Sequence, residues 1–165
     1  SGEIAESTLV ARRVAYLYYA TCAAPAYLAG HGRPSHPDEL RDHRCIDHFH
    51  GGARTPDWQF SRGKVRVSVP AAAQLAIDDD NAYVAAVEAG LGIAQVPAFI
   101  LKEAMERGTL DLVLPDWIPE PAPLYVVYPR HRQLSSRVRV FVDWVAALLD
   151  AHDGIQLRST LPRGR

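Results

Sequence analysis

The stretch Ala89-Gly90-Leu91-Gly92-Ile93-Ala94-Gln95-Val96-Pro97 indicates a helix end, a buried strand and a helix start in immediate succession. Apolar residues at helical spacing follow Asp78, and the two glycines of the stretch end that predicted helix. The apolar residues 93–96 then predict a buried strand, and Pro97 predicts the start of a second helix, which Gly108 ends. Strands that alternate with helices are typical of an α/β fold, which we therefore expect.

Strand and helix signals continue on both sides of this stretch. Residues 12–22 are rich in β-branched and aromatic types and predict one long strand. In residues 58–69, three valines alternate with polar residues, which predicts a hairpin with one buried face. The final helix begins at Ser135 or Ser136, and its predicted apolar stripe is Val138, Phe141, Val142, Val145, Leu148 and Leu149. Short helices from Pro25 and over 37–42, and strands over 44–48, 74–77, 110–114 and 124–128, complete the prediction.

The composition narrows the class of protein. The chain has 165 residues, of which 48% are hydrophobic and 22% charged, so it can bury a core and is neither disordered nor collagen-like. Its 18 Lys and Arg against 19 Asp and Glu give a net charge of -1, which supplies no field to attract nucleic acid or an anionic membrane. No apolar run approaches the ~20 residues of a membrane span, and no signal peptide opens the sequence. We therefore expect a cytoplasmic protein in which Cys22 and Cys45 are reduced.

Three histidines and one cysteine lie close together in residues 43–50, a set of the kind that binds zinc. In an extended strand, His48 and His50 face one way while His43 and Cys45 face the other, which divides the four side chains between two faces. We therefore expect a strand with exposed imidazoles and no metal site. Metal binding stays open as an alternative, as does an enzyme that uses these histidines and the aspartates of residues 78–80.

Asp78-Asp79-Asp80-Asn81 stands at the predicted turn from a strand into a helix. Catalytic carboxylates need a neighbouring acid, base or metal, and the sequence places none beside this cluster. Carboxylates at a helix N-terminus cap free N–H groups, which we expect of one of the three aspartates. A ligand role for another stays open, because α/β folds bind ligands at the carboxyl ends of their strands.

Eight short segments of the sequence occur in an order and spacing that one protein family shares. They are STLVAR (7–12), AAPAYL (23–28), PDEL (37–40), HRC (43–45), WQF (58–60), AGLGIA (89–94), GTL (108–110) and YP (128–129). Together with the final helix, they resemble the effector-binding region of LysR-type transcriptional regulators. Each segment alone is weak, but the whole series over residues 7–150 is specific.

The resemblance implies a fold similar to type 2 periplasmic binding proteins, with two subdomains joined by crossing strands around a small-molecule cleft. Residues 1–20 and 125–165 are then a remnant of the first subdomain, and residues 21–124 form the second. The proline-rich segment 115–123 falls at the second crossing. The family's N-terminal helix-turn-helix and the opening part of its first subdomain have no counterpart, so we expect a domain truncated on its N-terminal side.

The resemblance also implies an effector site at two strand-to-helix turns. The expected residues are Thr21 at the hinge, Ala76, Ile77, Asp78 and Asp79 at the first turn, and Val96, Pro97 and Ala98 at the second. The helix N-termini would offer N–H groups, with Ile77 and Val96 as an apolar wall. Asp78 stands where the family commonly has Asn, so we expect the effector to place no carboxylate against this helix end.

The expected partners follow from the same resemblance. They are a small-molecule effector and further copies of the protein, as dimers and, at full length, tetramers. DNA is expected to bind only through the helix-turn-helix that this chain lacks. We expect no cofactor, no catalysed reaction and no membrane contact. The alternative is a solute-binding protein of a transport system, which has the same fold but carries a secretion signal.

Overall fold

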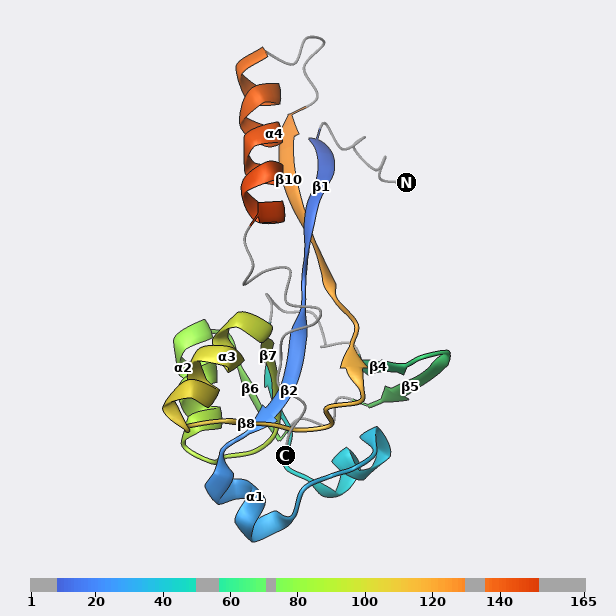
Figure 1. The fold of residues 1–165 in the computed structure, drawn as a ribbon, viewed down its shortest axis with the longest axis vertical. Helices are drawn as coiled ribbons and strands as arrows, with labels where there is room; N and C mark the ends of the chain where they lie inside the picture. The colour runs from blue at the N-terminus through green and yellow to red at the C-terminus, as the bar shows by residue number, and fades with distance from the viewer. Residues whose placement is uncertain (1–8, 50–56, 71–73, 130–135, 152–165) are drawn as a thin grey trace, which may run out of the picture. The chain divides into compact units, whose positions relative to one another are not determined.

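Two compact units make up the part of the chain that the computed structural model describes, which is residues 9–49, 57–70, 74–129 and 136–151 (Figure 1). Unit 1 contains the described residues of 1–17 and 121–156, and unit 2 contains those of 18–120. The elements in chain order are β1 (Leu9–Leu17), β2 (Tyr19–Ala23), α1 (Pro25–His31), the 3-10 helix η1 (Pro37–Asp42), β3 (Ile46–His48), β4 (Trp58–Arg62), β5 (Val65–Val69), β6 (Leu75–Ile77), α2 (Asp80–Glu88), β7 (Ala94–Pro97), α3 (Ala98–Arg107), β8 (Asp111–Leu112), β9 (Ile118–Pro119), β10 (Ala122–Pro129) and α4 (Ser136–Ala151).

Unit 1 is a two-stranded ribbon with one helix. β1 pairs with β10 in antiparallel fashion along its whole length, with a register shift between Arg13 and Ala15. α4 packs against β1, and Nη1 of Arg12 lies 2.6 Å from Oδ1 of Asp143. Both of these side chains are about half exposed, so their ion pair contributes no more than about 1 kcal/mol. Burial of apolar side chains between helix and ribbon is therefore the main stabilising contribution within this unit.

α4 carries apolar residues over a wider arc than the ribbon can cover. Val138, Phe141 and Leu148 belong to the predicted apolar stripe, and they are 38%, 56% and 50% exposed. The residues of α4 that are buried or half-buried are Val142, Val145, Ala146 and Leu149.

Unit 2 is built on a mixed sheet in the order β6-β3-β7-β2-β8. β3 and β6 are parallel, and β2 pairs with β7 and β8 in antiparallel fashion. A parallel bridge between Cys45 and Ile93 links the two sets of strands. Its hydrogen bonds run from the Ile46 N–H to the Ile93 carbonyl and from the Ile93 N–H to the Arg44 carbonyl, both 2.8 Å. The expected α/β class is confirmed in this unit.

A separate apolar cluster lies on each side of this sheet. α2 and α3, which lie next to each other in Figure 1, cover one side, where they meet Cys22 of β2 and Val96 of β7. α1, η1 and the small β5-β4-β9 sheet supply the cluster on the other side, which includes Ala23 and Ile93. Successive residues of β2 and β7 therefore point into different clusters, as the period of two in a strand requires.

The β4–β5 hairpin differs from its prediction. Its valines do alternate with polar residues, but only Val69 is buried, Val67 is half-buried and Val65 is 51% exposed. The buried residues of the hairpin are Trp58, Phe60 and Val69, which belong to the cluster on this side of the sheet, whereas Val65 lies at the tip opposite Arg62. The prediction of one continuous buried face was therefore wrong for its tip.

Several predicted strands have different bounds in the structure. The single strand expected over 12–22 is two strands, β1 and β2, which separate at Tyr18 because they pair in different sheets. The strand expected over 110–114 is only the two residues of β8. The proline-rich segment contributes β9 and the start of β10, since prolines are tolerated at strand ends.

Glycines end helices where the sequence predicted. Gly108 follows α3 with a φ of 72°, a left-handed conformation that glycine adopts without strain. Gly92 has a different role, because a Cβ atom there would collide with the backbone carbonyl of Arg44. The close approach of these two backbones allows the bridge between β3 and β7 to form.

Candidate functional site

The carboxyl ends of three strands meet at one edge of the unit 2 sheet. β3 ends at His48, β6 at Ile77 and β7 at Pro97, while antiparallel β2 begins at Tyr19 opposite Pro97. Edges of this kind are the usual ligand-binding position in α/β folds. The structure therefore brings together the two turns that were predicted to form the site, 76–79 and 96–98.

The predicted residues differ in what they present at this edge. Their exposure falls into three groups. Ala76, Asp78 and Asp79 are exposed, Ile77 and Pro97 are half-buried, and Thr21, Val96 and Ala98 are buried. Val96 belongs to the cluster under α2 and α3, so its side chain supports the edge from within and does not form an apolar wall on its surface.

The helix N-termini at this edge are partly satisfied by the protein itself. Oδ1 of Asp79 accepts the Ala82 N–H at 2.8 Å, which confirms that one aspartate caps α2. At the start of α3, the Ala98 N–H donates to the Tyr18 carbonyl at 2.9 Å. Two of the N–H groups that the prediction offered to a ligand are therefore already bonded.

His48 is a residue of this edge that the sequence interpretation did not assign to the site. Its Nε2 atom lies 2.9 Å from Oδ1 of Asp80, in the first turn of α2. Its ring meets that of Tyr83 edge to face, with 5.1 Å between centroids. The imidazole is only 18% exposed, so the expected exposed imidazole was wrong for His48. The alternation of side chains along the strand correctly predicted that His48 and Cys45 lie on opposite faces of the sheet. No sequence signal, however, predicted that His48 contacts α2.

Tyr83 fixes the position of α2 against β7. Its hydroxyl donates to the Gln95 carbonyl at 2.9 Å and accepts the Gln95 N–H at 3.2 Å. Burial raises the pKa of the Tyr83 phenol, so the group stays protonated and can donate. At the same edge, burial and then the nearby Asp80 carboxylate raise the pKa of Tyr19.

The histidine-rich segment does not form a metal site in the part that the structure describes. Within residues 9–49, 57–70, 74–129 and 136–151, no three His, Cys, Asp or Glu side chains come together as ligands. Oη of Tyr27 lies 3.2 Å from Nδ1 of His43, and the Cys45 thiol donates to the Leu40 carbonyl at 3.6 Å. Cys45 thus lies on the other side of the sheet from His48, as predicted. His50 lies outside the described residues.

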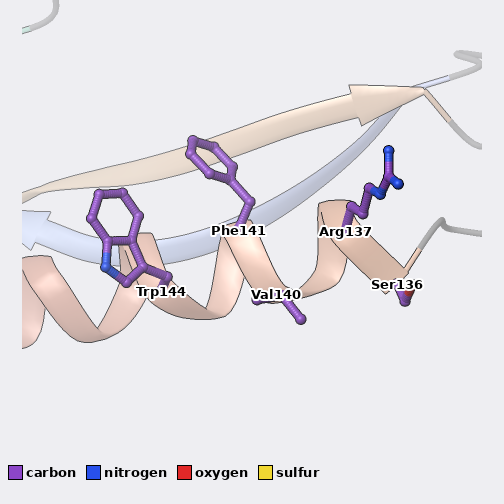
Figure 2. Close-up of a pocket in the computed structure, with 5 residues that line it drawn as sticks. All are labelled: Ser136, Arg137, Val140, Phe141 and Trp144. Carbon is purple, nitrogen blue, oxygen red and sulfur yellow. The ribbon is translucent and has the colours of Figure 1, made fainter.

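A surface pocket lies on α4 in unit 1 (Figure 2). The Phe141 and Trp144 rings extend in the same direction from the helix, with 6.0 Å between centroids. Ser136, Arg137 and Val140 complete the lining, which is mainly apolar. No residue of this pocket was predicted to bind the effector, and its apolar character resembles a surface that another polypeptide covers.

Comparison with known proteins gives the class of this chain. A sheet with parallel strands, whose carboxyl ends carry polar turns, defines a ligand-binding α/β domain. The regulatory domain of AphB from Vibrio vulnificus has this fold, with a TM-score of 0.66 and 28% identity over 89% of this chain and 72% of that one. Full-length AphB of Vibrio cholerae, a virulence activator of the LTTR family, matches with a TM-score of 0.69 and 28% identity. The match covers 88% of this chain and 49% of that one.

The chain belongs to the LysR substrate-binding domain family, whose model matches residues 1–150. It is 33% identical over 150 residues to the uncharacterised regulator YhjC of Escherichia coli K12, covering 90% of this chain and 50% of YhjC. It is 34% identical over 157 residues to the repressor PA14_22550 of Pseudomonas aeruginosa UCBPP-PA14, covering 94% and 50%. The chain is therefore the effector-binding regulatory domain of a LysR-type transcriptional regulator, a family without enzymatic activity.

The chain spans about half the length of the curated relatives that it matches. The matched half is the regulatory one, and it contains no DNA-binding module. No helix in the described part of the chain is long and apolar enough to cross a lipid bilayer.

Proposed function

We propose that the carboxyl edge of β6, β3 and β7 forms one wall of an effector cleft, and that the first subdomain supplies the other wall. The proposed contacts remain Thr21 with residues 76–79 and 96–98. The observation that supports this most is that both turns lie at one sheet edge of a LysR substrate-binding domain. Effector binding favours one orientation of the two subdomains and shifts the regulator between two states. The domain binds the effector and performs no chemistry on it.

The charge of this edge sets the chemical class of the effector. Asp78, Asp79 and Asp80 are all exposed, and His48 is the basic side chain paired with them, through Asp80. A carboxylate of the effector placed here would face the negative charges of Asp78 and Asp79 at short range. An amine or a hydroxyl group can instead donate to these carboxylates. We therefore assign a cationic or hydrogen-bond-donating group of the effector to this edge.

Three ring compounds that differ in charge test this assignment. Calorimetric titration of the chain with benzylamine, benzyl alcohol and benzoate is expected to give the weakest binding for benzoate. Asp78→Asn is expected to strengthen benzoate binding about threefold to tenfold, because it removes one carboxylate charge. Asp116→Asn removes the same charge from an exposed turn elsewhere in unit 2 and is expected to change nothing. Weaker benzoate binding in Asp78→Asn would contradict the assignment.

We also propose that residues 1–20 and 125–165 are part of a first subdomain, and that residues 21–124 are the second. Two observations support an incomplete first subdomain. The chain covers only 72% of the AphB regulatory domain. Unit 1 also exposes large apolar side chains on the ribbon as well as on α4, since Tyr125 and Val127 of β10 are 53% and 54% exposed. In a longer protein, the remaining part of the subdomain would bury these faces.

The fluorescence of Trp144 tests whether a further segment covers α4. Trp144 is 57% exposed, whereas Trp58 and Trp117 are 7% and 3% exposed. In the 165-residue chain, Trp144→Phe is expected to remove the long-wavelength, iodide-quenched part of the fluorescence emission. In the full-length protein, the same substitution is expected to remove a component that iodide quenches weakly. Equal quenching of Trp144 in the two proteins would contradict the view that a further segment covers α4.

The whole protein is proposed to be a cytoplasmic regulator that binds DNA through an N-terminal helix-turn-helix. It is also proposed to assemble as homodimers and, at full length, as tetramers. Membership of the LysR family supports both statements. Sedimentation of the full-length protein beside the 165-residue chain tests the assembly, with a tetramer expected for the former. A full-length monomer at micromolar concentration would contradict it.

A further inference from the structure

Thr21 and Gln95 form a cross-strand pair in the unit 2 sheet. They lie directly opposite each other in the β2–β7 register. Cβ atoms of directly opposed residues are about 4.5–5.5 Å apart and lie on the same face. Their chain neighbours Cys22, Ala94 and Val96 pack under α2 and α3, so Thr21 and Gln95 point to the other side of the sheet.

Among the residues that the structure describes, neither side chain finds a partner for its buried polar atom. Thr21 is 1% exposed, and neither its Oγ1 atom nor Nε2 of Gln95 has a hydrogen bond with any described residue. Three of their four backbone polar groups are in contrast hydrogen-bonded. The Thr21 carbonyl accepts the Val113 N–H at 2.8 Å, and Tyr83 bonds both the N–H and the carbonyl of Gln95.

Unpaired buried polar groups are costly. Each one destabilises a protein relative to a paired group, so native structures contain few of them. Val and Leu would fill the same positions without this cost. The pair therefore indicates a third group that accepts hydrogen bonds from both residues.

We propose that Thr21 and Gln95 together bind one hydrogen-bond-accepting group of the effector, a carbonyl or carboxylate oxygen. This proposal rests on the proposed function and extends it. The pair lies two positions inside the edge where Tyr19 faces Pro97, next to the second turn of the effector site. A hydroxyl and a carboxamide both donate, which suits an oxygen acceptor. Gln95 is half-buried as a residue, whereas Oγ1 of Thr21 and Nε2 of Gln95 are themselves buried.

The effector then has two different ends. An amine or hydroxyl group meets the aspartates that follow β6, and an oxygen acceptor meets Thr21 and Gln95, on β2 and β7. This division reconciles a negatively charged edge with an effector that contains a carbonyl or carboxylate group. The two ends are tested independently, because the substitutions that affect them lie on different strands.

Acetate and acetamide are suitable probes because both carry an acceptor oxygen and only acetate is charged. In spectra of the ¹⁵N-labelled chain, at least one of them is expected to shift the Gln95 side-chain amide saturably. Thr21→Val is expected to weaken that shift about threefold to tenfold, the effect of one lost hydrogen bond. The Gln59 amide, which donates to Ser68 at 2.7 Å on an exposed strand, is expected to stay unchanged.

Stability measurements separate a ligand role from a structural one. Thr21→Val and Gln95→Leu are expected to leave the melting temperature of the probe-free chain equal or higher, since each removes an unpaired polar group. Gln59→Leu, the matched control, is expected to lower it slightly. A lower melting temperature for both variants, with no shift of the Gln95 amide by either probe, overturns the proposal and indicates a structural water. If a probe shifts the backbone amide signals of residues 76–79 but not the Gln95 side-chain amide, this proposal is overturned while the proposed function stays intact.

Discussion

Nε2 of His48 lies 2.9 Å from Oδ1 of Asp80, which joins the carboxyl end of β3 to the first turn of α2. The carboxylate is 91% exposed and the imidazole 18% exposed, so water screens one side of the pair. Exposed pairs of this kind contribute about 0–1 kcal/mol. The interaction therefore orients groups at the proposed site and has a small effect on the free energy of unfolding.

Asp80→Asn is expected to lower the free energy of unfolding by less than about 1 kcal/mol, because an amide oxygen still accepts from His48. Urea unfolding measures this change. The same substitution is expected to leave the α2 cap intact, since that hydrogen bond belongs to Asp79. A decrease in the free energy of unfolding of more than about 3 kcal/mol would contradict this, because only a buried ion pair has so large an effect.

Tyr83→Phe is expected to be much more costly, at about 1–3 kcal/mol. It removes the hydroxyl that serves both the carbonyl and the N–H of Gln95, and Tyr83 is only 4% exposed. Urea unfolding monitored by far-UV circular dichroism gives the value. Tyr125→Phe is the control, because Tyr125 is 53% exposed. Equal stability of the two variants would contradict the role given to the Tyr83 hydroxyl.

Gly92→Ala is expected to destabilise the domain by at least about 2 kcal/mol, because its Cβ would overlap the Arg44 backbone and force β3 away from β7. Gly30 offers a matched comparison, since a Cβ there meets nothing within 4 Å. Gly30→Ala lies in α1 and is expected to stabilise by up to about 1 kcal/mol. Thermal unfolding of both variants checks the prediction, and the opposite order of stability would refute it.

The two cysteines make the stability fall at high pH. Burial raises the pKa of Cys22 from 9.0 to about 12, and burial followed by the Asp47 charge raises that of Cys45 to about 11. Above about pH 9 the unfolded chain releases these protons while the folded chain keeps them, so the free energy of unfolding decreases as pH rises. Below that pH both states hold the protons and the effect vanishes.

Urea unfolding at about pH 8 and about pH 10 measures this dependence. Over that interval, Cys22→Ala is expected to lose about 1 kcal/mol less stability than the unsubstituted chain. Cys22 is fully buried, so the variant also leaves a cavity and is less stable at both pH values. For each protein, the comparison therefore uses the change in the free energy of unfolding between the two pH values. If that change were the same for Cys22→Ala and the unsubstituted chain, Cys22 would have the same pKa in the folded and unfolded states.

Local signals in the sequence predicted the order of the elements well. Gly108 ends α3 and Asp79 caps α2, because the conformation or side-chain oxygen needed at each position belongs to few residue types. The single strand predicted over 12–22 was wrong, since a run of strand-forming residues does not show that Tyr18 separates two strands with different partners. In α4, apolar spacing predicted the stripe but did not show which of its residues stay exposed, among them Phe141 and Leu148.

The candidate site was predicted in part. The two turns followed from family resemblance together with the rule that ligands bind at carboxyl strand ends. His48 could not be assigned to the site, because its contact with Asp80 joins residues that are distant in the chain and depends on the parallel pairing of β3 with β6. Gln95 was missed for a similar reason, since only the β2–β7 register places it opposite Thr21.

The pairing of β1 with β10 has a consequence for synthesis of the protein on the ribosome. Leu9 pairs with Pro129, and all of unit 2 lies between them in the chain. The residues of β1 emerge early, but their partner strand is made only after unit 2 is complete. Until then β1 lacks its partner β10 and its apolar side chains lack α4, a state that favours chaperone binding or aggregation. Unit 2 can meanwhile fold as it emerges. A pause in translation before residue 122, where β10 begins, would therefore prolong the time that β1 spends without its partner strand.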